Sequence, residues 1–205
     1  MKPTVIVAPT YFGNIYYYSV LANYGRVLMD VHEHFVKQSY RTRCTIYGAN
    51  GKLNLILPLE KRTKRTPVKE IKISYEENWR KVHWKSLESA YRSSPYFEFY
   101  EDDIAPFFEK KYDFLLDMNL DIQATLLDLL GIEPAIVQTE SYEKEHPDAD
   151  DFRDKIHPKT EAFTHDEYLQ VFQEKYGFIG NLSVVDLLFN LGPEAGSFLK
   201  GNFEY

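Results

Sequence analysis

The 205-residue chain lacks the features that mark secreted and membrane proteins. Its single cysteine, Cys44, cannot form an internal disulfide. The N-terminal MKPTVIVAPTYFGN interrupts its apolar run too early for a signal peptide. No uninterrupted apolar run approaches the roughly 18 residues needed to cross a bilayer. We therefore expect a cytoplasmic protein with no membrane span.

The sequence also lacks the short motifs of common nucleotide-binding and hydrolytic enzymes. It contains no Walker loop, no GxGxxG after a strand, no HExxH, no GxSxG and no CxxC. These absences argue against the common nucleotide and hydrolase classes. The sequence contains no motif that identifies a cofactor, so the cofactor is unknown.

The chain also has fewer basic than acidic residues. Lys and Arg number 24 against 31 Asp and Glu, a formal net charge of −7, and such a surface repels nucleic acid. The charge is uneven, because residues 37–92 are rich in Lys and Arg whereas residues 102–154 are rich in acids. The KRTKR run at residues 61–65 fits a solvated loop, with a polyanion contact as the alternative. We expect no nucleic-acid partner, while a local anion site in the first half stays open.

Apolar and aromatic residues, by contrast, are abundant. They make up 44% and 16% of the chain, with 16 Tyr and 14 Phe, which indicates a globular protein. A chain of this length can bury a core without disulfide or metal. We predict one domain over residues 1–205 of mixed α/β class, with a β-rich N-terminal third that contains a hairpin, followed by a mainly helical C-terminal part.

Periodicity and turn signals predict the individual elements. Two strands flank a short helix in a β-α-β unit, and Asn50-Gly51 marks a hairpin that needs a positive φ at the glycine. The predicted strands cover residues 4–8, 26–30, 43–47, 53–57, 68–74 and 132–138. The predicted helices cover residues 15–22, 77–93, 104–109, 112–130 (capped by Gly131), 164–176 (opened by the capping box THDE), 183–191, and a last one from Pro193.

One segment is predicted to be a long loop or arm rather than a helix or strand. Residues 142–158 are acidic, bounded by proline and nearly free of aliphatic side chains. Long segments of this kind inside a compact domain are often lids or linkers. We predict a long acidic loop or arm within residues 140–163.

Residues 31–51 are the densest source of candidate site residues. Glu33, Lys37, Gln38, Arg41 and Arg43 lie there, and the forked guanidinium groups suit a carboxylate or phosphate. The alternative is that the two arginines are solubilising charges on a hairpin strand, paired with Asp30 or Glu33. The HEH triplet at residues 32–34 has no evident third ligand, so we predict no metal. Cys44 fits a buried structural cysteine.

His83 is the second candidate. It follows Trp79 by four residues on one helix face, where a histidine with a near-neutral pKa could act as a general base. The alternative is a histidine at the edge of the core, hydrogen-bonded to a backbone carbonyl. Asp186, in VVDLLFN, fits the third residue of a capping box.

Four sequence blocks in order resemble one family. PTYFGN, EHFVKQSYRTRC before a hairpin, NWRKVHWKSLESAYRSSPYFEFY and GFIGNLSVVDLLFNLGPEA together are similar to the WbqC-like proteins. The chain departs from the family pattern at Ala8, Gly13, Thr42 and Gly180. Thr42 stands where the family has an asparagine between two arginines, which removes one amide contact.

The resemblance implies a transferase of bacterial surface polysaccharide (O-antigen-type) biosynthesis that attaches an amino acid such as glycine to a sugar. In that hypothesis Arg41 and Arg43 hold an anion, and His83 or Glu33 moves a proton. Tyr11, Trp79 and Tyr91 are the walls on which a sugar stacks. The alternative is a non-catalytic protein of the same pathway that binds a sugar nucleotide or a partner. Homo-oligomerisation stays open.

Overall fold

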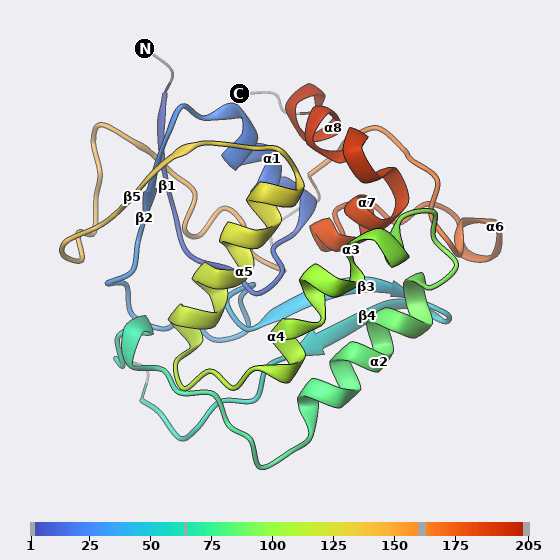
Figure 1. Cartoon of the computed structure of the whole chain (residues 1–205). Coiled ribbons are helices and arrows are strands. Elements are labelled where there is room, and N and C mark those ends of the chain that lie inside the picture. The colour runs from blue at the N-terminus through green and yellow to red at the C-terminus, as the bar shows by residue number, and fades with distance from the viewer. Residues whose placement is uncertain (1–2, 64, 160–162, 203–205) are drawn as a thin grey trace.

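The computed structural model describes residues 3–63, 65–159 and 163–202. It confirms the mixed α/β class, with strands concentrated early in the chain and helices later (Figure 1). In chain order the elements are β1 (Thr4–Val7), α1 (Ile15–Asn23), β2 (Arg26–Met29), β3 (Arg43–Gly48), β4 (Gly51–Ile56), the 3-10 helix η1 (Val68–Glu70), α2 (Trp79–Tyr91), α3 (Phe97–Ile104), α4 (Pro106–Glu109), α5 (Leu115–Leu129), β5 (Ala135–Gln138), β6 (Asp150–Asp151), α6 (Gln173–Tyr176), α7 (Val184–Leu191), the 3-10 helix η2 (Gly192–Glu194) and α8 (Ala195–Gly201).

The predicted β-α-β unit is confirmed. β1 and β2 pair in parallel, with Thr4 opposite Arg26, and α1 connects them. Asn14 starts that helix because its side-chain oxygen accepts the backbone N–H of Tyr17. The sheet grows on both sides to the order β5-β2-β1-β6, and every pairing is parallel. All four carboxyl ends therefore meet at one edge of the sheet.

The predicted hairpin is also confirmed, as a separate two-stranded sheet. Gly48 pairs with Gly51, and Gly51 has the positive φ that the turn requires, at 96°. One face buries Cys44, Ile46 and Leu55, and α2 packs against β3. In Figure 1 the hairpin and α2 lie on one side of the molecule and the parallel strands on the other, with α5 between them in this view.

Two predicted helices match closely and contribute much of the core. α2 buries Trp79, His83 and Leu87, whereas Val82 is 60% exposed and lies outside the buried face. α5 buries Leu115, Met118, Ile122 and Leu126 along one stripe, and Gly131 follows it with φ 61° as the expected C-terminal cap. The sequence missed α3, which begins just after the Ser94-Pro95 stop signal. It is a short helix.

Two predicted elements are wrong. Residues 68–74 form η1 and isolated bridges from Leu59 to Ile73 and from Lys72 to Phe114, because no continuous partner strand lies beside them. The helix predicted over residues 164–176 is reduced to α6. Tyr168 and Gln170 point inward while the intervening Leu169 is 82% exposed, an alternation typical of extended chain.

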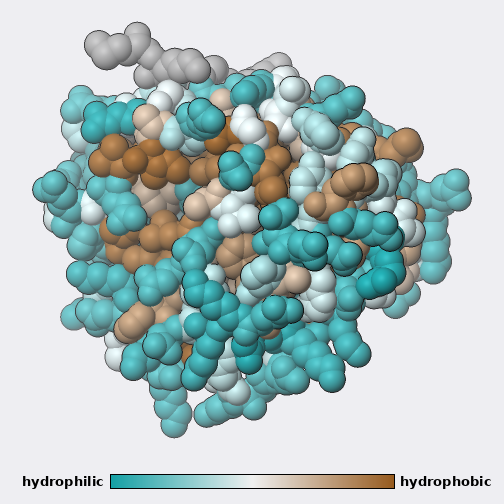
Figure 2. Space-filling model, viewed as in Figure 1, coloured by the Kyte–Doolittle hydropathy of each residue, from teal (hydrophilic) through white to brown (hydrophobic). Residues whose placement is uncertain are grey.

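The predicted strand over residues 132–138 is present as β5, and the arm that follows is more ordered than expected. Most of residues 140–149 is exposed, but residues 150–151 form β6 beside β1, and Phe152 and Ile156 are buried. The end of the predicted arm, residues 160–162, lies outside the described residues. Figure 2 shows apolar surface on the upper left of the molecule, the side on which Figure 1 places β5, where Ile136 and Val137 are exposed.

The contact between α8 and the end of α5 yields a stability prediction. A Cβ on Gly196 would lie 2.0 Å from the carbonyl oxygen of Leu130, so we expect Gly196→Ala to lower the free energy of unfolding by about 2–3 kcal/mol. Gly201→Ala in the same helix is the matched control, because its Cβ would meet nothing within 4 Å. Urea denaturation of both variants measures the difference. Equal stability of the two would contradict the close approach.

Candidate functional site at the carboxyl edge of the parallel sheet

Three segments meet where the parallel strands end. Asp30 follows β2 and donates its N–H to the carbonyl of Val7, Thr139 follows β5 and donates to Met29, and the N–H of Phe152 beyond β6 donates to Ile6. Ligands of open α/β sheets bind outside the carboxyl ends of the strands. This edge is therefore the first place to look for a site.

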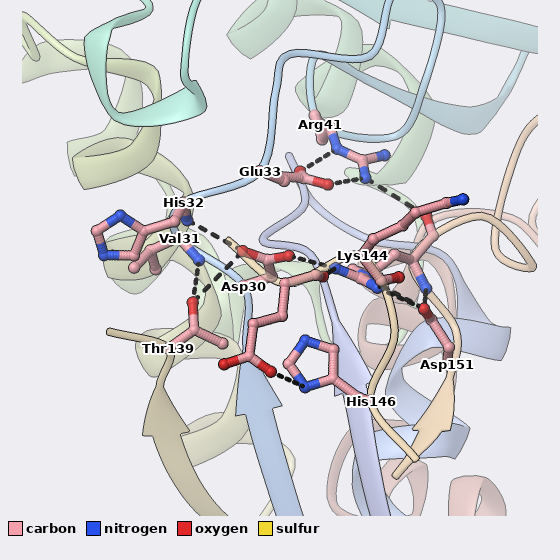
Figure 3. Close-up of polar contacts among 11 residues, drawn as sticks. Asp30, Val31, His32, Glu33, Arg41, Thr139, Lys144, His146 and Asp151 are labelled. Carbon is pink, nitrogen blue, oxygen red and sulfur yellow. Dashed lines mark hydrogen bonds and ion pairs between the residues drawn. The ribbon is translucent and has the colours of Figure 1, made fainter. Parts of the chain in front are cut away.

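Asp30 organises that edge. Its carboxylate is fully buried and accepts the N–H of His32 at 3.0 Å and the hydroxyl of Thr139 at 3.4 Å (Figure 3). Its other oxygen accepts Nη1 of Arg153 at 2.7 Å. The carboxylate thus fixes the turn after β2 and holds the arm against the sheet.

Arg153 holds the arm in place through the N–H groups of its guanidinium. It pairs with Asp151 at 2.6 Å in addition to Asp30, and it donates to the backbone carbonyls of Glu143 and Lys144 at 2.8 and 2.9 Å. The hydrogen bond to Asp151 raises the pKa of Arg153, and burial opposes it. Burial would raise the pKa of Asp151, but the hydrogen bonds from Arg153 outweigh this and lower it. All the donors of this guanidinium are used within the protein, so Arg153 acts as a structural clamp.

Glu33 and Arg41 form a second buried pair beside the first. Nε of Arg41 donates to Oε1 and Nη2 to Oε2 of Glu33 in the bidentate geometry, with 2.5 Å for the second bond. Nη2 also reaches the carbonyl of Arg153 at 3.4 Å. Burial raises the pKa of Glu33, and the hydrogen bonds from Arg41 oppose the shift. The interpretation of Arg41 as an exposed solubilising charge is wrong, because it is 2% exposed and precedes the strand, although its expected pairing with Glu33 is present.

Arg43 is placed differently. It is the first residue of β3 and partly exposed, and its buried Nε has no hydrogen-bond partner among the described residues. Arg41 and Arg43 both lie close enough to His157 to lower the pKa of that imidazole, although burial is the larger cause. Lys37 and Gln38 lie exposed in the preceding turn, where Gln38 has φ 57°. Arg43 is thus a cation near the sheet edge for which the described residues show no ion pair.

Tyr11, Trp79 and His83 form a separate aromatic cluster. The hydroxyl of Tyr11 lies 2.8 Å from Nδ1 of His83, and the rings of Trp79 and His83 are 5.4 Å apart. Each of the three residues is at most 4% exposed. Burial lowers the pKa of His83 to about 4, although the carbonyl of Ile56 favours the charged form. The imidazole is therefore neutral at pH 7 and packed in the core, as in the alternative stated for it.

Tyr91 belongs to a third group, around Asp186. The fully buried Tyr91 donates its hydroxyl to Asp186 at 2.8 Å and accepts the N–H of Tyr47. Tyr168 and Gln170 also donate to the carboxylate of Asp186, at 2.5 and 3.0 Å. The capping interpretation of Asp186 is wrong, because its carboxylate bonds to side chains far along the chain rather than to the start of α7.

The structure brings together only part of the predicted site. Glu33, Arg41 and Arg43 lie at or next to the sheet edge. The backbone N–H of Tyr11 donates to the carbonyl of Tyr40 beside Arg41, but the side chains of Tyr11, Trp79, His83 and Tyr91 are buried in the two other clusters. Sequence reasoning missed Arg153 and Asp151, and it treated Asp30 only as a partner for the arginines. The signal for Asp30 was its place directly after a predicted strand. No metal-binding group of three His, Cys, Asp or Glu residues occurs in the described part of the chain.

Comparisons with known proteins point to one family. The model of the WbqC-like protein family matches residues 8–170. A Mycobacterium tuberculosis protein, "Uncharacterized protein Rv1507c", is 23% identical over an alignment 229 positions long that covers 98% of this chain and 98% of the relative. No solved structure matches the chain. Within the described residues, no helix is both long and apolar enough to pass through a membrane.

The Glu33–Arg41 pair yields a prediction about stability. Arg41→Ala leaves a carboxylate buried without its cation, and we expect a loss of about 3–5 kcal/mol in the free energy of unfolding. Glu33→Leu combined with Arg41→Met removes both charges and should recover most of that loss. Arg92→Ala is the control, because Arg92 pairs with Glu88 at 3.0 Å on the exposed face of α2, and such pairs contribute less than about 1 kcal/mol. A loss for Arg41→Ala no greater than for Arg92→Ala would contradict a stabilising pair.

The buried His83 predicts a pH dependence of stability. Above pH 6.5 the imidazole is neutral in both folded and unfolded chains. Between pH 6.5 and about 4 only the unfolded chain takes up the proton, so the free energy of unfolding should fall by roughly 1.4 kcal/mol per pH unit and level off below that range. Urea denaturation of the wild type and His83→Gln from pH 4 to 8 isolates the contribution. Identical slopes for the two proteins would show that His83 titrates normally.

Proposed function

The chain belongs to the WbqC-like protein family, and from this membership we propose that it is a transferase of bacterial surface polysaccharide biosynthesis. Its substrate in this proposal is an anionic sugar precursor or sugar nucleotide. The group transferred is an amino acid such as glycine. The carboxyl edge of the parallel sheet is the proposed site.

The observation that carries the proposal is the placement of Arg41 and Arg43. Glu33 holds the guanidinium of Arg41 in one orientation, and Nη1 of Arg41 makes no hydrogen bond to the described residues. Arg43 adds a buried Nε that has no partner among them. A buried donor without a partner costs free energy, which a bound carboxylate or phosphate oxygen would recover. The two arginines are thus suited to hold the anionic part of a substrate.

Glu33 is the better placed of the two predicted proton carriers. It lies with the arginines, whereas His83 is neutral and packed among aromatic rings. In the proposed reaction a hydroxyl or amine of the sugar attacks the carbonyl carbon of an activated aminoacyl donor, and the bond to the leaving group breaks. The proton lost by the sugar passes to Glu33. Burial raises the pKa of this carboxyl, the direction that proton uptake requires.

The alternative function is non-catalytic binding of a sugar nucleotide or a partner protein in the same pathway. One observation favours it: both oxygens of Glu33 already accept hydrogen bonds from Arg41, which stabilises the ionised form. In that case the arginines recognise the anion and no proton moves. The same surface would then serve for recognition alone.

Arg43 variants test the site. We expect Arg43→Ala to reduce the amino acid content of surface polysaccharide at least about tenfold in a complemented deletion strain, because one bidentate anion contact is lost. Arg43→Lys should retain part of the function. Arg65→Ala, in the exposed loop, is the matched control and should restore the wild-type polymer. Full restoration by Arg43→Ala would remove this residue from the site.

Glu33→Gln distinguishes transferase from binder. The amide keeps the size of the side chain and can still accept one hydrogen bond from Arg41. Calorimetric titration with a panel of nucleoside-diphosphate sugars, and polysaccharide analysis in the same strain, give separate readouts. Loss of the polymer substituent with unchanged binding supports the transferase. An unchanged polymer shows that Glu33 carries no proton.

A further inference from the structure

A pocket of about 610 Å³ lies on the helical side of the molecule, and none of the sheet-edge residues lines it. Its walls are the junction of α2 and α3, the extended segment of residues 167–171 and the region where α7, η2 and α8 meet. Its volume is in the range of small-molecule sites. We propose that it binds a small organic cation with an apolar body, a second site independent of the proposed transferase function.

The pocket has a fixed floor. Tyr168 and Gln170, both less than 10% exposed, line it and donate to the buried carboxylate of Asp186 behind them. The amide of Gln170 also donates to the carbonyl of Ile179 and accepts the N–H of that residue. These bonds explain why the segment is extended here rather than helical. A floor held in this way is formed before a ligand arrives.

The walls supply apolar surface. Leu191 and Phe198 line the pocket from α7 and α8, and Leu169 stands at 82% exposure beside it. Apolar and aromatic side chains of this kind are the usual lining of small-molecule pockets. The body of a ligand can therefore be aliphatic or aromatic.

The charge of the lining sets the sign of the ligand. Glu167 and Glu194 are its charged residues, and none of the described lining residues is Lys, Arg or His. Arg92, just before the lining residue Ser93, is already paired with Glu88. Asp186, which accepts the hydrogen bonds of Tyr168 and Gln170, is a further acidic residue behind the floor. A positively charged amine or ammonium group complements this surface, whereas a carboxylate or phosphate is repelled.

Three congeners test the proposal: 4-phenylbutylammonium, 4-phenylbutanol and 4-phenylbutanoate. Chemical shifts of backbone amides, titrated with each compound, give both the location and the Kd. We expect the ammonium compound to bind in the millimolar range normal for so small a ligand, with shifts centred on residues 167–171 and 190–198. It should bind at least about fivefold more tightly than the alcohol and tenfold more tightly than the carboxylate.

Matched variants separate the charge from the cavity. Glu167→Gln with Glu194→Gln should remove the preference for the cation, while Glu70→Gln with Glu109→Gln makes the same change in net charge away from the pocket and should preserve it. Ser197→Trp should block all three compounds by filling the space. Equal affinities for the three congeners, or shifts centred elsewhere, would overturn the proposal. None of these residues lies at the sheet edge, so this result is independent of the transferase test.

Discussion

The ion pair between Asp30 and Arg153 is the interaction on which the sheet edge depends. It joins residues 123 positions apart, and it is nearly inaccessible to water. Two charges buried in this way are stable only if their remaining hydrogen-bonding capacity is also satisfied. Thr139, the N–H of His32, Asp151 and two backbone carbonyls satisfy it. The arm can lie against the sheet because its polar anchor is completely bonded.

On the helical side, Asp186 is the buried acidic residue that holds neighbouring segments together, as Asp30 does at the sheet edge. Its carboxylate is fully buried and gathers donors from α2 and from the extended segment before α6. Burial raises the pKa of this carboxyl, and the three hydrogen bonds oppose the shift. The two centres differ in kind: one balances charge with charge, the other holds a carboxylate with neutral donors. The sheet edge therefore contains paired cations, whereas the charged residues that line the helical pocket are Glu167 and Glu194.

The sequence predicted best where structure depends on near neighbours. Asn50-Gly51 and Gly131 after α5 act within a few residues, and the corresponding turn and helix end are present. The capping box at residue 164 predicted a helix of which only α6 is present, because the hydrogen bonds of Tyr168 and Gln170 to Asp186 depend on residues far along the chain. Arg153 was missed for the same reason, since nothing near it in the sequence indicates Asp30. The aromatic candidates were found as residue types, but their burial follows from tertiary packing that periodicity alone cannot give.

The arm is longer than the straight distance between the strands that it connects. It leaves β5 at one edge of the sheet and returns as β6 at the other, three strand spacings away, a distance of about 14 Å. Residues 139–149 could span roughly 36 Å if extended. The surplus chain lies between two fixed ends, one at Thr139 and the other at Arg153. Insertions or deletions in this segment can therefore be accommodated by the loop itself, without altering the register of β5 or β6.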